Sequence, residues 1–497
     1  MMNGRGKSDG PVVPSKSSNK AGQPAAETME ERGPAKGNAD QGTASRTQSQ
    51  STAPNGLDRV RRAATKDRKG RMTALLHHVT VGRLRSAFLT VEKHAAAGID
   101  GVTWQQYAKR LEENLQALHG RLHRGGFRAR PSRRVYIPKA DGRQRPLGIA
   151  ALEDKIVQRA VVEVLNAVYE VDFLGLSYGF RPGRSQHQAL DALSVGIRRK
   201  KVNWVLDADI RGFFDALDHQ WLLKFVAHRI GDRRVLALIQ KWLRAGVLEG
   251  GQWKATEEGT PQGASISPLL ANIYLHYVFD LWIQRWRKTR AHGDVIVVRY
   301  ADDFVVGFQY ESDAVRFQDE LRIRFCKFAL ELNAEKTRLI RFGVFAAQQR
   351  LERGEGRPET FDFLGFTHIC GKSRSAKFLL RRRTISRRLH AKLREVRGEL
   401  RRRWHIPVRE QGRWLAQVIR GYFAYHAVPT NYQRMGQFRR EIVRLWYCAL
   451  KRRSQRDRTT WPRMTQLAET WLPRARILHP WPEERFDART RGKSPVR

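Results

Sequence analysis

Two acidic residues interrupt an apolar run that reads VIVVRYADDFVVGF, from Val295 to Phe308. β-Branched and aromatic residues flank the interruption on both sides, as is typical of buried strands. Asp302 and Asp303 are therefore predicted to lie at the tip of a β-hairpin. Acidic pairs are common in turns, so this pair alone does not establish a site.

A second acidic strand makes a site more plausible. It reads NWVLDADI from Asn203 to Ile210, and RGFFD follows it. Side chains alternate between the two faces of a strand, so Asp207 and Asp209 project from one face, and Asp209 falls at the strand end. We expect Asp209 to lie near the acidic hairpin tip.

Carboxylates grouped in this way can hold hard divalent cations. Mg²⁺ prefers oxygen ligands, and two such ions about 4 Å apart can activate a 3′-hydroxyl and stabilise a leaving pyrophosphate during in-line displacement. Without metal ions or basic neighbours, such a cluster of like charges is unfavourable. The sequence therefore predicts a site for two Mg²⁺ ions.

The charge of the chain indicates a polyanionic partner. Its 497 residues include 93 Lys and Arg against 49 Asp and Glu, a net charge of +44. Such a field attracts nucleic acid, although composition alone also fits a basic ribosomal-type binding protein. Cys326, Cys370 and Cys448 are too few and too far apart for a disulfide framework or a cysteine-rich zinc module. The sequence contains no predicted membrane span or secretory signal, so we expect an intracellular protein without a membrane partner.

The sequence divides into five predicted segments. Residues 1–56 contain no Leu, Ile, Cys or aromatic residue and are expected to be a disordered tail. Residues 57–130 show helical periodicity, and residues 131–378 mix short strands with helices, which is typical of an α+β domain with an antiparallel sheet. Residues 379–460 carry a net charge of +18 and three helical apolar patterns. Residues 461–497 form a short tail.

Several motifs resemble those of reverse transcriptases and occur in the order found in that family. The tetrapeptide YADD, ending at Asp303, resembles the polymerase motif, and DIRGFFD, starting at Asp209, resembles the first acidic motif. Further blocks resemble the group II intron type and read GIDG at 98–101, IPK at 137–139 with RPLGI at 145–149, SYGFRPGRS at 177–185, GTPQGASISP at 259–268, LNAEKT at 332–337 and FDFLGF at 361–366.

This resemblance is strong over about residues 75–370 and looser over residues 379–460, which resemble the thumb or maturase domain. It implies a right-hand polymerase fold, with fingers and palm built from an antiparallel sheet and helices, and an α-helical thumb. Several family members carry a C-terminal HNH endonuclease with paired cysteines and histidines. This sequence lacks those pairs, so we expect residues 461–497 to be a reduced DNA-binding segment or a thumb extension.

The resemblance also assigns the catalytic residues. Asp209, Asp302 and Asp303 correspond to the ligands of the two Mg²⁺ ions, with help from the backbone carbonyl of Ile210. Phe214 matches the steric gate, where a bulky ring clashes with a ribose 2′-hydroxyl and selects deoxynucleotides. A core aromatic is the alternative interpretation of Phe214.

Other residues are expected to contact the incoming nucleotide or the nucleic acid. Lys139 and Arg145 flank a predicted hairpin turn and can both point toward the triphosphate, although a solvated face is the alternative. Gln262 and Gly263 match a segment near the templating pair, or form a simple helix-start turn. The expected template and primer contacts are Arg181, Gly263 and a primer grip at Phe363, Leu364 and Gly365, which an apolar strand packed in the palm would explain equally well.

The predicted function is that of an RNA-directed DNA polymerase that works with a group II intron RNA. It would assist splicing of that RNA and copy it into DNA from a DNA primer or target, with dNTPs, as a ribonucleoprotein in the bacterial cytoplasm. One alternative is a retron, diversity-generating or defence-associated reverse transcriptase. Another is an RNA-binding splicing factor whose polymerase site is incidental.

Overall fold

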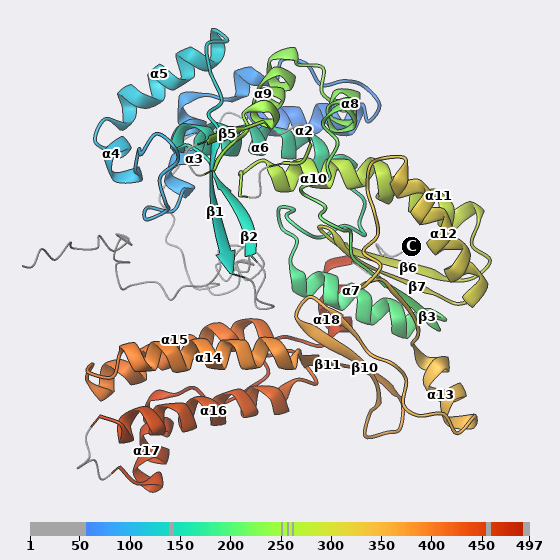
Figure 1. Ribbon diagram of the computed structural model, residues 1–497. Helices are drawn as coiled ribbons and strands as arrows, with labels where there is room; N and C mark the ends of the chain where they lie inside the picture. The colour runs from blue at the N-terminus through green and yellow to red at the C-terminus, as the bar shows by residue number, and fades with distance from the viewer. Residues whose placement is uncertain are drawn as a thin grey trace, which may run out of the picture.

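Three β-sheets and a large set of helices form the described part of the protein. The computed structural model describes residues 56–138, 144–249, 252–255, 258–260, 263–453 and 459–490. Helices lie above a central sheet and a separate helical layer lies below it (Figure 1). The mixture of helices and antiparallel strands confirms the predicted α+β class. None of the described helices combines the length and apolarity needed to cross a lipid bilayer.

The central sheet has four strands in the order β6-β7-β3-β8, and every neighbouring pair is antiparallel. Its strands are β3 (Trp204–Ala208), β6 (Val295–Tyr300), β7 (Asp303–Phe308) and β8 (Arg338–Arg341). Both faces are covered, one by α7 (Gln186–Arg199) and the other by α12 (Glu311–Cys326). Coverage on both sides explains why these strands are apolar without interruption.

The predicted hairpin around residue 140 belongs to a second sheet, in the order β2-β1-β4-β5. Its strands are β1 (Ser132–Pro138), β2 (Gln144–Ile149), β4 (Val247–Glu249) and β5 (Gln252–Lys254). Antiparallel pairing of β1 with β2 confirms the hairpin, whose turn lies outside the described residues. Of the predicted disordered tail, only Gly56 is described, and it begins α2 (Gly56–Lys66).

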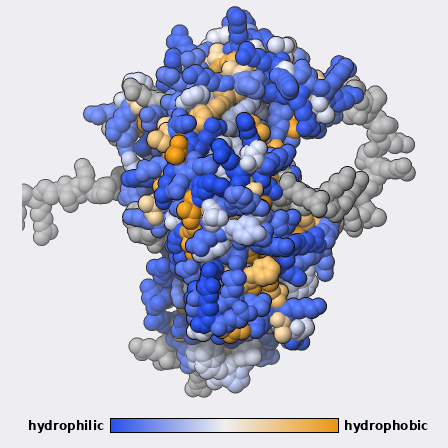
Figure 2. All heavy atoms as spheres, turned by 90° about the vertical axis from the view of Figure 1, so that its right-hand side faces the viewer, coloured by the Kyte–Doolittle hydropathy of each residue, from blue (hydrophilic) through white to orange (hydrophobic). Residues whose placement is uncertain are grey.

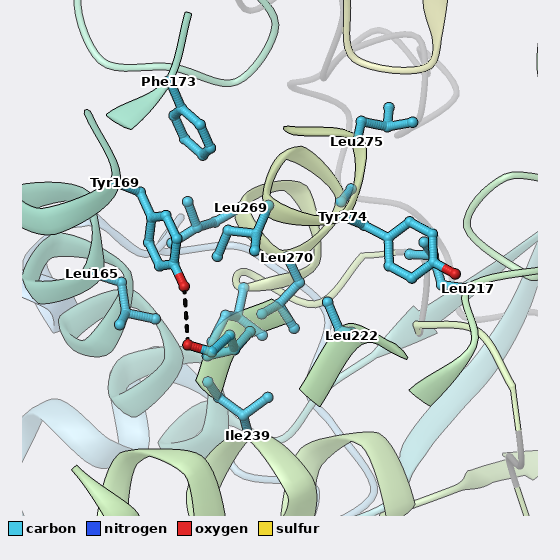
Figure 3. Close-up of a cluster of buried hydrophobic side chains, with 14 of the residues drawn as sticks. Leu165, Tyr169, Phe173, Leu217, Leu222, Ile239, Leu269, Leu270, Tyr274 and Leu275 are labelled. Carbon is cyan, nitrogen blue, oxygen red and sulfur yellow. Dashed lines mark hydrogen bonds between the residues drawn. The ribbon is translucent and has the colours of Figure 1, made fainter. Parts of the chain in front are cut away.

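Helices above the central sheet share one apolar core. The N-terminal ones are α3 (Val81–Thr90), α4 (Trp104–Ala108) and α5 (Leu111–His123), and the core helices are α6 (Leu152–Asp172), α8 (His219–Arg229), α9 (Arg233–Arg244) and α10 (Ser267–Leu275). Figure 3 shows side chains from α6, α8, α9 and α10 meeting in this core. A π-helical turn, His276–Asp280, joins α10 to α11 (Leu281–Thr289).

The outer side of the molecule near α12 and α13 (Val344–Glu352) is mainly hydrophilic. Figure 2 shows this side with apolar side chains only in small patches. Exposed apolar residues such as Ile323 of α12 and Leu351 of α13 are separate from one another in the sequence. Single exposed apolar residues are ordinary on a protein surface.

A third sheet leads into the basic helical region. It consists of β9 (Phe361–Phe363), β10 (Phe366–Lys372) and β11 (Phe378–Thr384), in the order β11-β10-β9. The three predicted helices follow as α14 (Ser386–Arg402), α15 (Val408–His426) and α16 (Tyr432–Lys451). We call α14–α17 the helical domain, where α17 is Trp461–Trp471.

One predicted boundary needs correction, and the predicted tail contains a further helix. Residue 379, the expected start of the helical domain, lies inside β11, because residues 378–384 pair along the whole of β10. Residues 461–471 form α17 and place Met464 and Ala468 in the core of the helical domain, in line with the alternative that residues 461–497 extend this domain. The spacing of four between these two residues is the helical signal for this segment.

The last described helix returns to the central sheet. It is α18 (Pro482–Thr490), which packs against α7. Arg198 pairs with Glu483, and Arg199 Nη2 lies 2.7 Å from Asp487 Oδ2. Phe486 is buried in the same cluster as the side chains of α7. Segments 288 residues apart in sequence therefore share one interface.

Candidate active site

The β6–β7 hairpin carries the acidic tip that the sequence predicts. Tyr300 pairs with Asp303 across the turn, and Ala301 has a φ of +57°. This left-handed conformation is uncommon for a residue with a side chain and usually needs support from its surroundings. Asp302 thus occupies a tight turn whose shape the neighbouring structure must maintain.

The register of β3 brings the second acidic motif to this tip. Pairing between β3 and β7 ends with Ala208 opposite Phe304. Continuing the register by one residue sets Asp209 beside Asp303, and alternation puts both side chains on the same face. Among the described residues, no three His, Cys, Asp or Glu side chains are grouped closely enough to hold one metal ion, so metal binding here stays a prediction.

Asp209 is held by the segment before β8. Lys336 Nζ donates to Asp209 Oδ2 at 2.7 Å, and Asn333 Nδ2 donates to the same oxygen at 3.2 Å. The backbone N–H of Asn333 also donates to the Asp209 carbonyl at 2.9 Å. Both residues belong to the LNAEKT block, from which no individual role was predicted for them. The structure shows that they fix the carboxylate and offset its charge.

Ile210 turns its backbone polar groups away from the segment before β8. It forms an isolated antiparallel bridge with Leu332, and the flanking hydrogen bonds are donated by the N–H groups of Arg211 and Asn333. Ile210 is therefore in a non-hydrogen-bonded pair, in which its own N–H and C=O point away from Leu332. Carboxylates and a carbonyl are the donor set that a hard divalent cation prefers.

Asp207 lies in a different environment from Asp209. Burial raises the pKa of Asp207 to about 7, and the Arg338 guanidinium, 3.7 Å away, opposes this rise. A carboxyl group that is half protonated near neutral pH is a poor ligand for a cation. The predicted set of ligands does not include Asp207.

A buried ion pair supports the acidic tip from below. Arg299 and Asp280 are both fully buried, and the Arg299 Nε and Nη2 atoms donate to the two Asp280 oxygens at 2.7 and 2.6 Å. Arg299 Nη1 donates to the carbonyl of Ala301 and to Asn272 Oδ1, both at 2.9 Å. Gly179 also lies against the tip, where an added Cβ would sit 2.3 Å from the Ala301 nitrogen. Sequence analysis missed this network, although an arginine within an apolar strand is a signal for it.

Comparison with known proteins identifies the family. The profile described as reverse transcriptase (RNA-dependent DNA polymerase) matches residues 137–368. Protein YkfC of Escherichia coli K12 is 38% identical over 294 residues, which are 52% of this chain and 77% of YkfC. Group II intron-encoded protein LtrA of Lactococcus lactis is 43% identical over 166 residues. The chain belongs to the group II intron reverse transcriptase family.

Some relatives are matched over only part of their length. The alignment with LtrA covers 33% of this chain and 27% of LtrA. The putative COX1/OXI3 intron 1 protein of Saccharomyces cerevisiae is 26% identical over 390 residues, which are 65% of this chain and 46% of the yeast protein. By resemblance to the reverse transcriptase fold, we call the central sheet the palm sheet and the β2-β1-β4-β5 sheet the fingers sheet.

The expected nucleotide contacts of this reverse transcriptase are placed in part. Lys139 and Gln262 lie outside the described residues. Arg145 is half-buried on β2, opposite Ile137. Gly263 has a φ of +108°, and an added Cβ would sit 2.7 Å from the carbonyl oxygen of Gly148 on β2. The lack of a side chain at Gly263 therefore lets the segment before α10 pack closely against β2.

Phe214 occupies a position compatible with both of its interpretations. It is half-buried and packs partly against the palm core, while the neighbouring Phe213 is buried at 2% exposure. Their rings meet edge to face with centroids 5.4 Å apart. Phe213 therefore fills the core, and Phe214 keeps part of its ring accessible.

Arg181 makes contacts that favour a structural role over the expected template contact. Its side chain is 3% exposed and forms an ion pair with Glu170 at 2.9 Å. Arg181 Nη1 also donates to the carbonyls of Leu174 and Ser177, each at 2.7 Å. A guanidinium committed to these acceptors stabilises the end of α6 and the loop after it.

The expected primer grip forms the turn between β9 and β10. Phe363 is buried at 4% exposure and faces the palm core. Leu364 and Gly365 have φ values of +45° and +82°, which are typical of a two-residue hairpin turn. The Tyr425 hydroxyl of α15 donates to the Leu364 carbonyl at 2.8 Å. The turn is therefore attached to the helical domain, and its role in primer binding stays a prediction.

Proposed function

We propose that this reverse transcriptase binds a group II intron RNA, assists its splicing and copies it into DNA by two-metal-ion nucleotidyl transfer. The observation that carries the proposal is the strand register that sets Asp209 beside Asp303 at the end of the palm sheet. The three-aspartate motif, the buried support for the hairpin tip and the similarity to group II intron-encoded relatives point to the same chemistry.

In this proposal Asp209, Asp302 and Asp303 hold two Mg²⁺ ions together with the carbonyl of Ile210. Bound Mg²⁺ would favour ionisation of the primer hydroxyl and offset charge on the leaving pyrophosphate. The chain's own groups orient these ligands. Lys336 and Asn333 fix the Asp209 carboxylate, and the Arg299 network maintains the turn that presents Asp302.

Substrate contacts follow the family resemblance. Arg145 and Lys139 would bind the triphosphate, Phe214 would exclude a ribose 2′-hydroxyl, and Gln262 with Gly263 would lie beside the templating pair. Cations near a triphosphate offset the charge that develops during transfer. The Leu364–Gly365 turn would contact the primer.

The helical domain is proposed to be the thumb and the main intron RNA surface. Residues 379–460 have a net charge of +18, and phosphate contacts by Lys and Arg supply affinity that is independent of sequence. Trp404 and Tyr432 are 54% and 56% exposed and can stack on unpaired bases. We propose that the protein acts as a ribonucleoprotein in the bacterial cytoplasm and uses a DNA primer or target.

The first test replaces a proposed metal ligand. Asp302→Ala should lower extension of a DNA primer on an RNA template by several orders of magnitude, since the remaining carboxylates cannot bind both ions. The matched control is Asp319→Ala, which removes an exposed carboxylate of α12 that pairs with Arg322, and extension should stay near wild type. Near-wild-type extension by Asp302→Ala would overturn the assignment.

A second measurement separates polymerisation from RNA binding. The double change Asp302→Ala/Asp303→Ala leaves the helical domain intact, so intron binding with a steep salt dependence and protein-assisted splicing at low Mg²⁺ should persist. If no candidate intron is bound or spliced while primer extension by the wild type is strong, a stand-alone reverse transcriptase of the retron or defence type becomes the better assignment.

A further inference from the structure

Residues 258–260 lie along the backbone of the Phe214 motif. The Thr260 N–H donates to the Phe214 carbonyl at 2.8 Å, and the Gly259 N–H donates to the Leu217 carbonyl at 2.8 Å. Asp218 and Glu258 form an antiparallel bridge beside them. These contacts hold residues 258–260 against the turn that carries the proposed steric gate.

This contact is close enough to require glycine at position 259. Gly259 has a φ of +81°, and an added Cβ would sit 2.9 Å from the Phe214 carbonyl oxygen and 2.9 Å from Asp215 Cα. Side chains essentially never approach backbone atoms at this distance, and a φ in this range is strained for any other residue. The position of the Gly259 peptide and the position of the Phe214 backbone are therefore mutually dependent.

His219 fixes the Gly259 peptide from the other side. Its Nε2 atom lies 2.6 Å from the Gly259 carbonyl oxygen, and because a carbonyl only accepts, Nε2 carries the hydrogen. Since His219 is the first residue of α8, it follows the N-cap residue Asp218, whose carboxylate accepts from the Trp221 N–H at 2.7 Å.

The base of His219 is anchored in the core. Leu217 precedes it and Leu222 follows one helical turn later, and both are buried at 0% exposure. Figure 3 shows these two leucines among the side chains of the shared core of α6, α8, α9 and α10. Because the His219 ring is attached to this tightly packed core, its hydrogen bond restricts movement of the Gly259 peptide.

We propose that His219 is a positioning residue for sugar discrimination. By holding Gly259, it keeps the Thr260 N–H against the Phe214 carbonyl and so fixes the height of the Phe214 ring beneath the incoming sugar. The inference rests on the proposed gate function of Phe214 and adds a residue that does not itself touch the nucleotide. A small shift of the ring would admit a 2′-hydroxyl while the three aspartates stay in place.

The test compares two substitutions of His219 in full-length protein. His219→Phe removes the donor and should reduce the ratio of kcat/KM for a dNTP to that for the matching rNTP about fivefold, the size expected for loss of one neutral hydrogen bond. The change should arise from better use of the rNTP. His219→Gln places an amide N–H near the position of Nε2, so the ratio should stay within about twofold of wild type.

The outcomes distinguish this inference from the proposed gate. If Phe214→Val leaves the ratio unchanged, the gate assignment itself fails. If Phe214→Val lowers the ratio but His219→Phe does not, or if His219→Gln lowers it as much as His219→Phe, the positioning role fails. Adding His219→Phe to Phe214→Val should cause no further loss, because both act through one ring. Should His219→Phe fail to fold, His219→Asn, whose amide is too short to reach Gly259, takes its place.

Discussion

Arg299 beneath the acidic tip and Arg382 beside the helical domain are both buried arginines paired with a buried aspartate. Arg299 donates to Asp280 through Nε and Nη2, and its remaining guanidinium nitrogen, Nη1, also has acceptors within the palm. The hydrogen-bond acceptors of this side chain lie on α10, the π-helical turn and the β6–β7 turn. The pair therefore stabilises one compact part of one domain.

Arg382 has partners from more distant segments. Its Nη1 atom donates to Asp191 of α7 at 3.1 Å, and Arg485 of α18 lies 2.9 Å from the other oxygen of that carboxylate. Burial raises the pKa of Asp191 and lowers the pKa of Arg382. Burial therefore disfavours the ionised forms of Asp191 and Arg382.

The difference between the two buried clusters indicates that the palm is more rigid than the junction of β11, α7 and α18. Fully hydrogen-bonded buried charges fix one geometry, as a turn that presents a catalytic carboxylate requires. A buried aspartate shared between β11, α7 and α18 instead makes the junction depend on three segments at once. We therefore expect the junction to respond more strongly than the palm to solution conditions.

The largest effect should follow loss of the palm arginine. Arg299→Met leaves Asp280 buried without its partner, and breaking such a pair costs about 3–5 kcal/mol. Urea unfolding should show this loss, and primer extension should fall even at temperatures where the variant stays folded. The double change Arg299→Met/Asp280→Leu should recover part of the stability. A single variant within about 1 kcal/mol of wild type would remove the basis of the comparison.

Acidification should distinguish the two regions next. Burial lowers the pKa values of His368 on β10 and His426 on α15 to about 3. The folded junction therefore holds neutral rings, while the unfolded chain takes up protons near pH 6.5. The stability that they contribute is fully present above pH 6.5 and is lost as pH falls toward 3, by about 2 kcal/mol per histidine at pH 5.

Hydrogen exchange at pH 7 and pH 5 would measure this effect. Amides of β10 and α15 should lose protection at pH 5, after correction for intrinsic rates, and amides of β6 and β7 should lose less. His426→Gln should flatten the pH dependence of the junction. Equal loss of protection in both regions would contradict a separately sensitive junction.

The smallest effect should come from the surface of the junction. Arg199 and Asp487 are 48% and 44% exposed, and exposed ion pairs contribute little to stability because solvent screens them. Arg199→Glu should destabilise the protein slightly at low salt and less at high salt. Adding Asp487→Lys should recover the stability that Arg199→Glu loses. A loss as large as that of Arg299→Met would show that the exposed pair, rather than Asp191, governs the junction.

Local patterns predicted most of the elements because each is bounded by clear signals. The apolar runs around Asp302 and Asp209 gave strands, and the helical spacing after Ile385 gave three helices. β11 was missed because its alternation of Arg and apolar residues resembles a basic surface, although Arg382 turns inward to Asp191. α17 was missed because its apolar residues are few and complete a core supplied by other helices.

For the candidate site, the sequence predicted the position of the carboxylates better than the residues that support them. Period-two alternation and motif order placed Asp209 near Asp302 and Asp303, since these follow from local sequence. The supports of the site, Asp280 and His219, depend on contacts between separate elements. The arginine within the apolar β6 strand signals that Arg299 needs a buried partner, but it does not identify Asp280. Arg181 shows the opposite case, in which a residue in a recognised motif is bound by the protein itself.

The packing of α18 on α7 also affects how this protein is made. Arg199 leaves the ribosome 288 residues before its partner Asp487. At a translation rate of about 5–20 residues per second, α7 is synthesised roughly 15–60 s before α18. Until then, the apolar surface that Phe486 covers and the arginines beside it face the crowded surroundings of the ribosome. The nascent palm is thus most open to chaperones and to stray RNA in that interval, and codons that slow translation late in the message would lengthen it.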